Sequence, residues 1–178
     1  MKAICVLLLS AYSAMAAGPL AAADAKPPAQ AARGQAAFFD ESVATHCGGC
    51  HSLAQKGTAV GPDLSRLAHL NARAIVMAIR ATRTQYVQWI KLKDGKEFPG
   101  MPGAKDEGTT VQYYDLSATP PALRKLAKSD IASAGDNATW KHPPESAGYT
   151  AQQLADVIAY IKWASYGDTK SVSTADTE

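Results

Sequence analysis

The sequence predicts a mainly α-helical fold with a small antiparallel β-sheet or hairpin inserted in its middle. Apolar residues recur at helical spacing near both ends of the chain. In the middle they alternate with polar residues, and an Asp-Gly pair occupies positions 94–95. The chain has 178 residues and a formal net charge of +2. Because it contains no long block of like charge, the sequence predicts no nucleic-acid partner.

The N-terminal residues 1–23 predict a signal peptide. Lys2 gives a short positive start, an apolar run follows, and small residues offer cleavage sites after Ala16 or Ala23. The apolar run is too short and too rich in alanine for a convincing membrane span. An N-terminal anchor that is not cleaved is the alternative interpretation. Residues 24–32 are rich in alanine and contain two prolines, and we expect them to form a flexible lead-in.

The first helix is expected to start at residues 34–39 and to be interrupted at residues 40–42 before the next segment. Gly34 has no side chain, so it would allow a second helix to approach closely at this point. We expect that second helix to be the last one of the chain, with Phe38 packed beside Tyr160. The two helices would then share one hydrophobic core.

The closing helix is predicted over residues 151–165, and Thr150 is a suitable N-cap. Apolar side chains repeat there at i, i+3, i+4 and i+7, which places them on one face of a helix. They are Leu154, Val157, Ile158 and Ile161. This face is expected to be buried, and residues 168–178, rich in Ser, Thr and Asp, are expected to form a disordered tail.

Another helix is predicted over residues 65–81, after a turn at residues 61–64. One side of it would carry apolar residues: Leu67, Leu70, Ala74, Met77 and Ala78. By this periodicity, Met77 is expected in the core rather than at a binding site.

The predicted β insert covers residues 86–131. Alternation and turn signals give four strands, at residues 87–93, 96–101, 109–116 and 123–126. Asp94 and Gly95 form a strong signal for the turn of a hairpin. These strands are expected to form a small antiparallel sheet within the helical domain.

Cys47, Cys50 and His51 form a Cys-x-x-Cys-His motif, the pattern for covalent attachment of haem. Two thiols at this spacing can add to the two vinyl groups of one haem, and the next histidine can bind the iron. A redox dithiol or half of a zinc site are the alternatives. Zinc would need further ligands, and the only other cysteine, Cys5, lies in the predicted signal peptide. We therefore predict one covalently bound haem c. The predicted signal peptide agrees with haem attachment, because bacteria attach haem c outside the cytoplasm. The predicted location is therefore the periplasm, or the protein is otherwise exported.

The chain resembles class I cytochrome c. The residues that carry the resemblance are Gly34 with Phe38, the motif at residues 47–51, the turn at residues 61–64 and the closing helix at residues 154–163. The resemblance implies a cytochrome c-like helical fold around one haem over residues 33–167. It also implies that the carbonyl of Pro62 accepts the Nδ1 hydrogen of His51, which orients the ring and raises its basicity.

The sixth iron ligand has two candidates. The chain is similar to a subgroup of cytochrome c domains that carry an inserted hairpin, and the resemblance places an axial methionine in a Leu-Met-Pro turn before the last helix. Here residues 140–144 read Trp-Lys-His-Pro-Pro, so His142 occupies that place. Met101, which also precedes a proline, is the alternative. His46 and His69 are poorly placed, since one adjoins the attachment site and the other lies in a predicted helix.

The predicted function is that of a one-electron carrier rather than an enzyme, because both axial positions of the iron have a candidate ligand. Redox partners would be proteins such as a periplasmic dehydrogenase or another cytochrome. Two alternatives stay open: a haem enzyme or gas sensor with an open sixth position, and a permanent electron-transfer subunit of a dehydrogenase or cytochrome assembly. Trp89, Tyr113 and Tyr114 could support self-association through the β insert, or could cover the sheet's own core.

Overall fold

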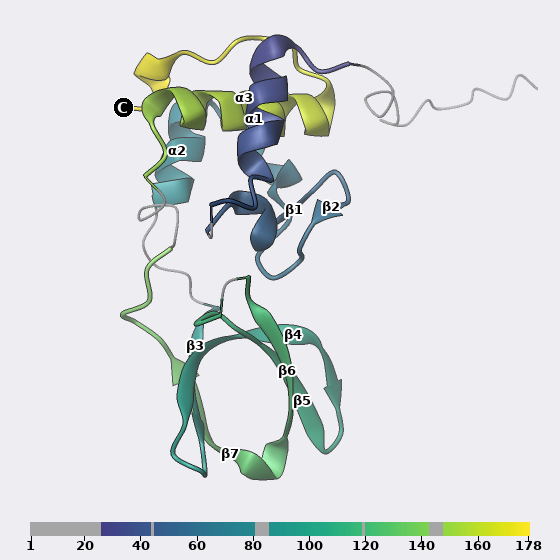
Figure 1. Ribbon diagram of the computed structural model, residues 1–178, viewed down its shortest axis with the longest axis vertical. Coiled ribbons are helices and arrows are strands. Elements are labelled where there is room, and N and C mark those ends of the chain that lie inside the picture. The colour runs from purple at the N-terminus through teal and green to yellow at the C-terminus, as the bar shows by residue number, and fades with distance from the viewer. Residues whose placement is uncertain (1–25, 44, 81–85, 119, 143–147) are drawn as a thin grey trace, which may run out of the picture.

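The computed structural model describes residues 26–43, 45–80, 86–118, 120–142 and 148–178. The predicted signal peptide at residues 1–23 lies outside the described residues. Figure 1 shows two lobes: the α-helices gather in one, and a curled sheet forms the other. None of the described helices combines the length and the apolar character that crossing a membrane requires.

Helices α1 (Ala29–Phe38) and α3 (Ala151–Tyr166) form the centre of the helical lobe. They cross at Gly34, where an added Cβ would lie 1.8 Å from the carbonyl oxygen of Asp156. The rings of Phe38 and Tyr160 meet edge to face at 5.7 Å between centroids, as predicted. The structure therefore confirms the crossing of the first and last helices.

Helix α3 begins where the sequence predicts. Thr150 accepts a hydrogen bond from the backbone N–H of Gln153, and the Gln153 side chain accepts from the N–H of Thr150, which completes a capping box. The four residues of the predicted apolar face are all buried: Leu154, Val157, Ile158 and Ile161. Gly167 ends the helix with φ +69°, in the left-handed region.

The predicted helix at residues 65–81 is in fact two elements, the short 3-10 helix η2 (Leu64–Leu67) and helix α2 (Ala72–Arg80). Asn71 starts α2, because its side chain accepts a hydrogen bond from the N–H of Ala74. Because the helix starts anew at this point, a different set of residues lies on its buried face, and Ile75 and Val76 face the core. The prediction that Met77 is a core residue was wrong, since Met77 is 69% exposed.

The second lobe is a five-stranded antiparallel sheet with strand order β6-β5-β4-β3-β7. Its strands are β3 (Gln88–Leu92), β4 (Glu97–Glu107), β5 (Thr110–Asp115), β6 (Ala122–Ala127) and β7 (Ile131–Asp136). The first four correspond to the predicted strands, whereas β7 was not predicted. Consecutive strands β6 and β7 form opposite edges, joined only by the 3-10 helix η3 (Lys128–Asp130), so the sheet curls as Figure 1 shows.

The prediction of a mainly α-helical fold was wrong, because the chain is a mixed α and β protein. The five strands hold nearly as many residues as the three α-helices. Strand β7 escaped prediction because residues 132–135 are small residues with weak strand preference, and pairing with β3 decides their conformation. The shortening of the predicted middle helix also lowers the helical content.

The sheet has a hydrophobic core of its own, built on Ile90, Phe98 and Tyr113. Tyr113 is therefore part of this core rather than a surface aromatic residue. The carboxylate of Asp115 is buried and pairs with the Arg124 guanidinium at 2.6 Å. A buried charge needs such a partner, so the pair closes the polar end of the core.

The C-terminal residues are packed on the helices instead of forming the predicted disordered tail. Two hydrogen bonds of 2.9 Å join Gln30 to Val172. The side-chain N–H of Gln30 donates to the carbonyl of Val172, and the backbone N–H of Val172 donates to the side-chain oxygen of Gln30. Thr177 is fully buried. The composition of the tail gave no signal for this, because its partners lie in distant parts of the chain. Helix α1 also begins at Ala29, inside the predicted flexible lead-in.

Candidate haem site

The Cys-x-x-Cys-His motif begins nine positions after the end of α1, and its first residues form the 3-10 helix η1 (Cys47–Gly49). The backbone N–H of His51 donates to the carbonyl of Cys47 at 2.9 Å, which turns the histidine back over the motif. Gly48 lies against Phe39, whose ring would be 2.5 Å from an added Cβ. Close packing on the end of α1 therefore explains the small residues between the two cysteines.

The segment after the motif forms hydrogen bonds with the motif's backbone. It begins with a small hairpin, in which β1 (Ser52–Leu53) pairs with β2 (Lys56–Gly57). Beyond it, the N–H of Thr58 donates to the carbonyl of Gly48, and the N–H of Gly61 donates to that of Cys50. The carbonyls of Cys47, Gly48 and Cys50 thus have hydrogen-bond partners within the site, which hold the segment in a defined conformation.

Both thiols are free and partly buried. Burial raises the pKa of the Cys47 thiol to about 11, and it also raises the pKa of the Cys50 thiol. A redox dithiol requires the opposite shift, because the thiolate is the reactive form. The raised pKa values therefore argue against a redox dithiol.

Tyr149 is a neighbour of the motif that sequence reasoning missed. Its phenol oxygen lies 4.0 Å from the sulfur of Cys47, and its hydroxyl donates to the carbonyl of Ala37 at 3.4 Å. It lies just before the N-cap of α3, so only the tertiary fold brings it to the cysteine.

His51 and Pro62 form the contact that the resemblance implied. Nδ1 of His51 lies 2.7 Å from the carbonyl oxygen of Pro62. A carbonyl can only accept, so Nδ1 carries the hydrogen and Nε2 is left with its lone pair. Burial lowers the pKa of His51, although the Pro62 hydrogen bond and the charge of Asp63 act in the opposite direction. The imidazole is therefore neutral at pH 7, the form in which histidine binds a metal.

The ring of His51 is also confined by Gly61. An added Cβ at position 61 would lie 2.5 Å from Cε1 of His51 and 2.8 Å from its Nδ1. Asp63 holds the same turn, because its carboxylate accepts from the backbone N–H of Ser65 and from the hydroxyl of Ser52. The Gly-Pro-Asp sequence thus builds the support for one histidine.

His142 is the residue that the structure places beside His51. The two ring centroids are 5.9 Å apart and the ring planes make an angle of 69°. Nδ1 of His142 lies 2.9 Å from the carbonyl oxygen of Ile79, at the end of α2. A carbonyl can only accept, so here too Nδ1 carries the hydrogen and Nε2 keeps its lone pair.

The spacing of these two histidines is compatible with one metal ion bound between them. A transition metal lies about 2 Å from a histidine nitrogen, so one ion between two imidazoles sets the ring centroids roughly 6 Å apart. The observed separation of 5.9 Å agrees with that value. Hydrogen bonding of the second ring nitrogen to a carbonyl is the usual arrangement of a histidine that binds a metal. Cys47, Cys50, His51 and His142 are therefore the residues that would hold the haem.

Met101 lies in the other lobe, in strand β4 and in register with Tyr114 of β5. Gly100 beside it faces the sheet core, so Met101 lies on the opposite face of the strand. His46 contacts the carbonyl of Val43 through Nδ1 at 2.9 Å, and His69 is exposed.

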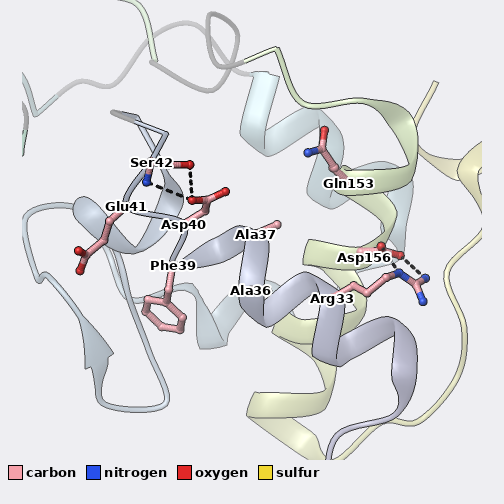
Figure 2. A pocket seen from close by; sticks show the side chains of 9 residues that line it. All are labelled: Arg33, Ala36, Ala37, Phe39, Asp40, Glu41, Ser42, Gln153 and Asp156. Atoms are coloured by element: carbon pink, nitrogen blue, oxygen red, sulfur yellow. Dashed lines mark hydrogen bonds and ion pairs between the residues drawn. The ribbon is translucent and has the colours of Figure 1, made fainter.

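A cavity of about 770 Å³ lies between the end of α1 and the start of α3, as Figure 2 shows. It is open to solvent and is lined by Phe39, the carboxylates of Asp40 and Glu41, and the ion pair of Arg33 with Asp156. The predicted haem ligands are not among its lining residues. Phe39 separates this cavity from Gly48 in the motif.

The comparison with protein families agrees with the geometry. Residues 31–118 match the family model of Cytochrome c. This region contains the Cys-x-x-Cys-His motif and Pro62, and it ends before His142. No curated protein matches the chain. The match supports a c-type cytochrome, a protein that binds haem c covalently and transfers electrons.

Proposed function

We propose that this protein is an exported monohaem cytochrome that carries single electrons, with its iron bound by His51 and His142. The observation that carries the proposal is the His51–His142 pair, 5.9 Å apart, with Nδ1 of each ring bonded to a backbone carbonyl. The single Cys-x-x-Cys-His motif supports one haem.

Haem, when bound, supplies a one-electron couple whose potential follows the axial ligands. Two imidazoles favour the oxidised iron more than a histidine and a methionine do. We therefore expect a reduction potential toward the low end of the roughly 0.8 V range over which axial ligands set the potential of haem. Pro62 and Ile79 strengthen this effect, because each carbonyl draws on the Nδ1 hydrogen and makes the ring a better donor. With both axial positions taken, electron transfer is favoured over chemistry at the iron.

The partners we propose are a periplasmic dehydrogenase or another cytochrome. The signal-like start of the sequence, with its positive residue and apolar run, supports export to the periplasm. A permanent place in a larger assembly is the competing arrangement. Sedimentation of the purified protein separates the two, because a free carrier sediments as a single small species.

An optical and electron paramagnetic resonance spectrum of the oxidised protein tests the ligation. We expect a low-spin iron without the weak far-red band of a methionine sulfur–iron bond, and a low reduction potential by titration. His142→Met should raise the potential and introduce the band. Met101→Leu is the matched control and should change neither.

Two results would contradict the proposal. A far-red band in the wild type that disappears in Met101→Leu would assign the sixth position to Met101. A high-spin wild type that binds carbon monoxide or cyanide rapidly would point to an open sixth position, as in a haem enzyme or gas sensor.

A further inference from the structure

We propose that the C-terminal residues 172–178 position the sixth iron ligand, His142, through Arg80 and the end of helix α2. This inference rests on the proposed ligation by His51 and His142. It assigns a function to a segment that lies outside the haem motif and after the closing helix. The connection runs through contacts of the described residues, one step at a time.

The first step is the hydrogen bond that holds His142. Its acceptor is the carbonyl of Ile79, one residue before the end of α2. The last four carbonyls of a helix have no partner within the helix, and the helix end carries a partial negative charge. The carbonyl of Ile79 therefore restrains the ring of His142, as the carbonyl of Pro62 restrains that of His51. The position of His142 thus depends on where α2 ends.

The second step is the attachment of that helix end to the C-terminal residues. The guanidinium of Arg80 donates to the carbonyl of Thr177 at 2.9 Å and to that of Glu178 at 3.4 Å. Ile79 and Val172 also pack on the same cluster, formed by Ile75, Val76 and Ile158. A charged and an apolar contact thus join the last turn of α2 to the tail.

The third step is the anchoring of the tail itself. Val172 exchanges two hydrogen bonds with Gln30 of α1. The hydroxyl of Thr177 is buried and lies 2.9 Å from the carbonyl of Ala151, the first residue of α3, and 2.8 Å from that of Thr174. The tail therefore binds all three helices, and it can fix the end of α2 relative to the helices that hold the motif.

Arg80→Met tests this connection, because it keeps the apolar stem and removes both hydrogen bonds. The readout is the rate at which carbon monoxide binds the ferrous holoprotein, since it must displace the sixth ligand. Coupling between sites is typically 5- to 150-fold. We expect the rate to rise about tenfold in Arg80→Met, with partial recovery in Arg80→Lys. Arg73→Met, at an exposed arginine of the same helix, is the matched control and should leave the rate unchanged.

Thr177→Val gives a second variant, because it removes the hydroxyl that anchors the tail to Ala151 and changes no residue of α2. We expect a smaller increase of the same sign, about threefold by a weaker coupling. Melting temperatures are measured in parallel, and all rates are taken well below them. A lower melting temperature with an unchanged rate in both variants would show that the tail only stabilises the fold, and would overturn the proposal. A wild-type iron without two histidine ligands would be recognised from the spectrum before any variant is made, and would overturn the ligation and this inference together.

Discussion

At the scale of single residues, two backbone carbonyls decide which nitrogen each histidine offers to a metal. Pro62 and Ile79 accept from Nδ1 of His51 and His142, respectively. Each hydrogen bond selects the tautomer that carries its lone pair on Nε2 and restrains the ring. Burial keeps His51 neutral, because it lowers the pKa of the imidazole. The two histidine rings are thus oriented by backbone groups.

Gly61→Ala tests how closely the ring of His51 is confined. The added Cβ would lie 2.5 Å from Cε1 of a ring that is also held by Pro62, so the ring or the turn must move. We expect a loss of about 1–3 kcal/mol in the free energy of unfolding of the holoprotein, the usual cost of overpacking. Denaturant titration measures it.

Gly135→Ala is the control for that substitution, because an added Cβ there meets open space. It should change stability by no more than about 0.5 kcal/mol. Equal effects of the two substitutions would show that the contact between Gly61 and His51 carries no strain.

At the scale of the elements, the crossing of α1 and α3 combines a glycine, an edge-to-face pair of aromatic rings and an ion pair between a buried carboxylate and an exposed arginine. Asp156 faces Arg33 with a 2.7 Å contact, and its carboxylate also accepts from Gln152. Burial alone would raise the pKa of Asp156, but these hydrogen bonds and the Arg33 charge outweigh it, so the pKa lies below its usual value. The pair therefore favours the folded state only while Asp156 is ionised.

The stability of this crossing should depend on pH in a defined direction. The folded-state pKa of Asp156 is depressed, so its contribution is complete above the unfolded value near 3.9 and is lost as the pH falls through the lower folded-state value. We expect Asp156→Asn to cost about 1–2 kcal/mol at pH 7, a value reduced by the exposure of Arg33. The cost should shrink at pH 3, as urea titrations of both proteins would show.

Glu41→Gln is the control for the pH series. Glu41 lies in the exposed turn after α1 and lines the same cavity (Figure 2). Its substitution should change stability by no more than about 0.5 kcal/mol at either pH. A cost of Asp156→Asn that is the same at pH 3 and pH 7 would contradict the ionic origin of the effect.

At the scale of the whole molecule, the two lobes have separate hydrophobic clusters. Phe38, Leu53 and Tyr160 belong to the cluster of the helical lobe, and Ile90 and Phe98 belong to that of the sheet. The chain passes between the lobes after α2 and returns after β7, just before His142. The sheet can therefore lose order without removing a side chain from the core around the motif.

Phe98→Ala tests this independence. The loss of a buried phenylalanine costs about 3–5 kcal/mol, which is enough to open a small lobe. We expect faster hydrogen exchange in β3 to β7, with unchanged protection in α1 and α3 and an unchanged haem spectrum. Ile158→Ala in the helical lobe is the converse control and should speed exchange in the helices. A general loss of protection in Phe98→Ala would show that the two lobes unfold as one unit.

The sequence by itself determined the features that depend on neighbouring residues. The capping box at Thr150, the buried face of α3, the Asp-Gly hairpin and the four strands around it follow from local patterns, because caps, turns and periodicity act over a few positions. The same is true of the Cys-x-x-Cys-His motif and of the turn at residues 61–64. The His51–Pro62 contact was implied by the resemblance to class I cytochrome c, and it spans only eleven positions. The interruption of the middle helix at Asn71 was missed, although its signal is local.

Only the tertiary structure decided the features that depend on distant partners. Strand β7 exists because β3 offers it an edge, and this pairing makes the fold mixed α and β rather than mainly α. The tail is ordered because Gln30, Arg80 and Ala151 bind it from three helices. His142 meets His51 across 91 positions of sequence, and its acceptor Ile79 is 63 positions away. No local pattern encodes such contacts, since they arise only when separate elements pack against one another.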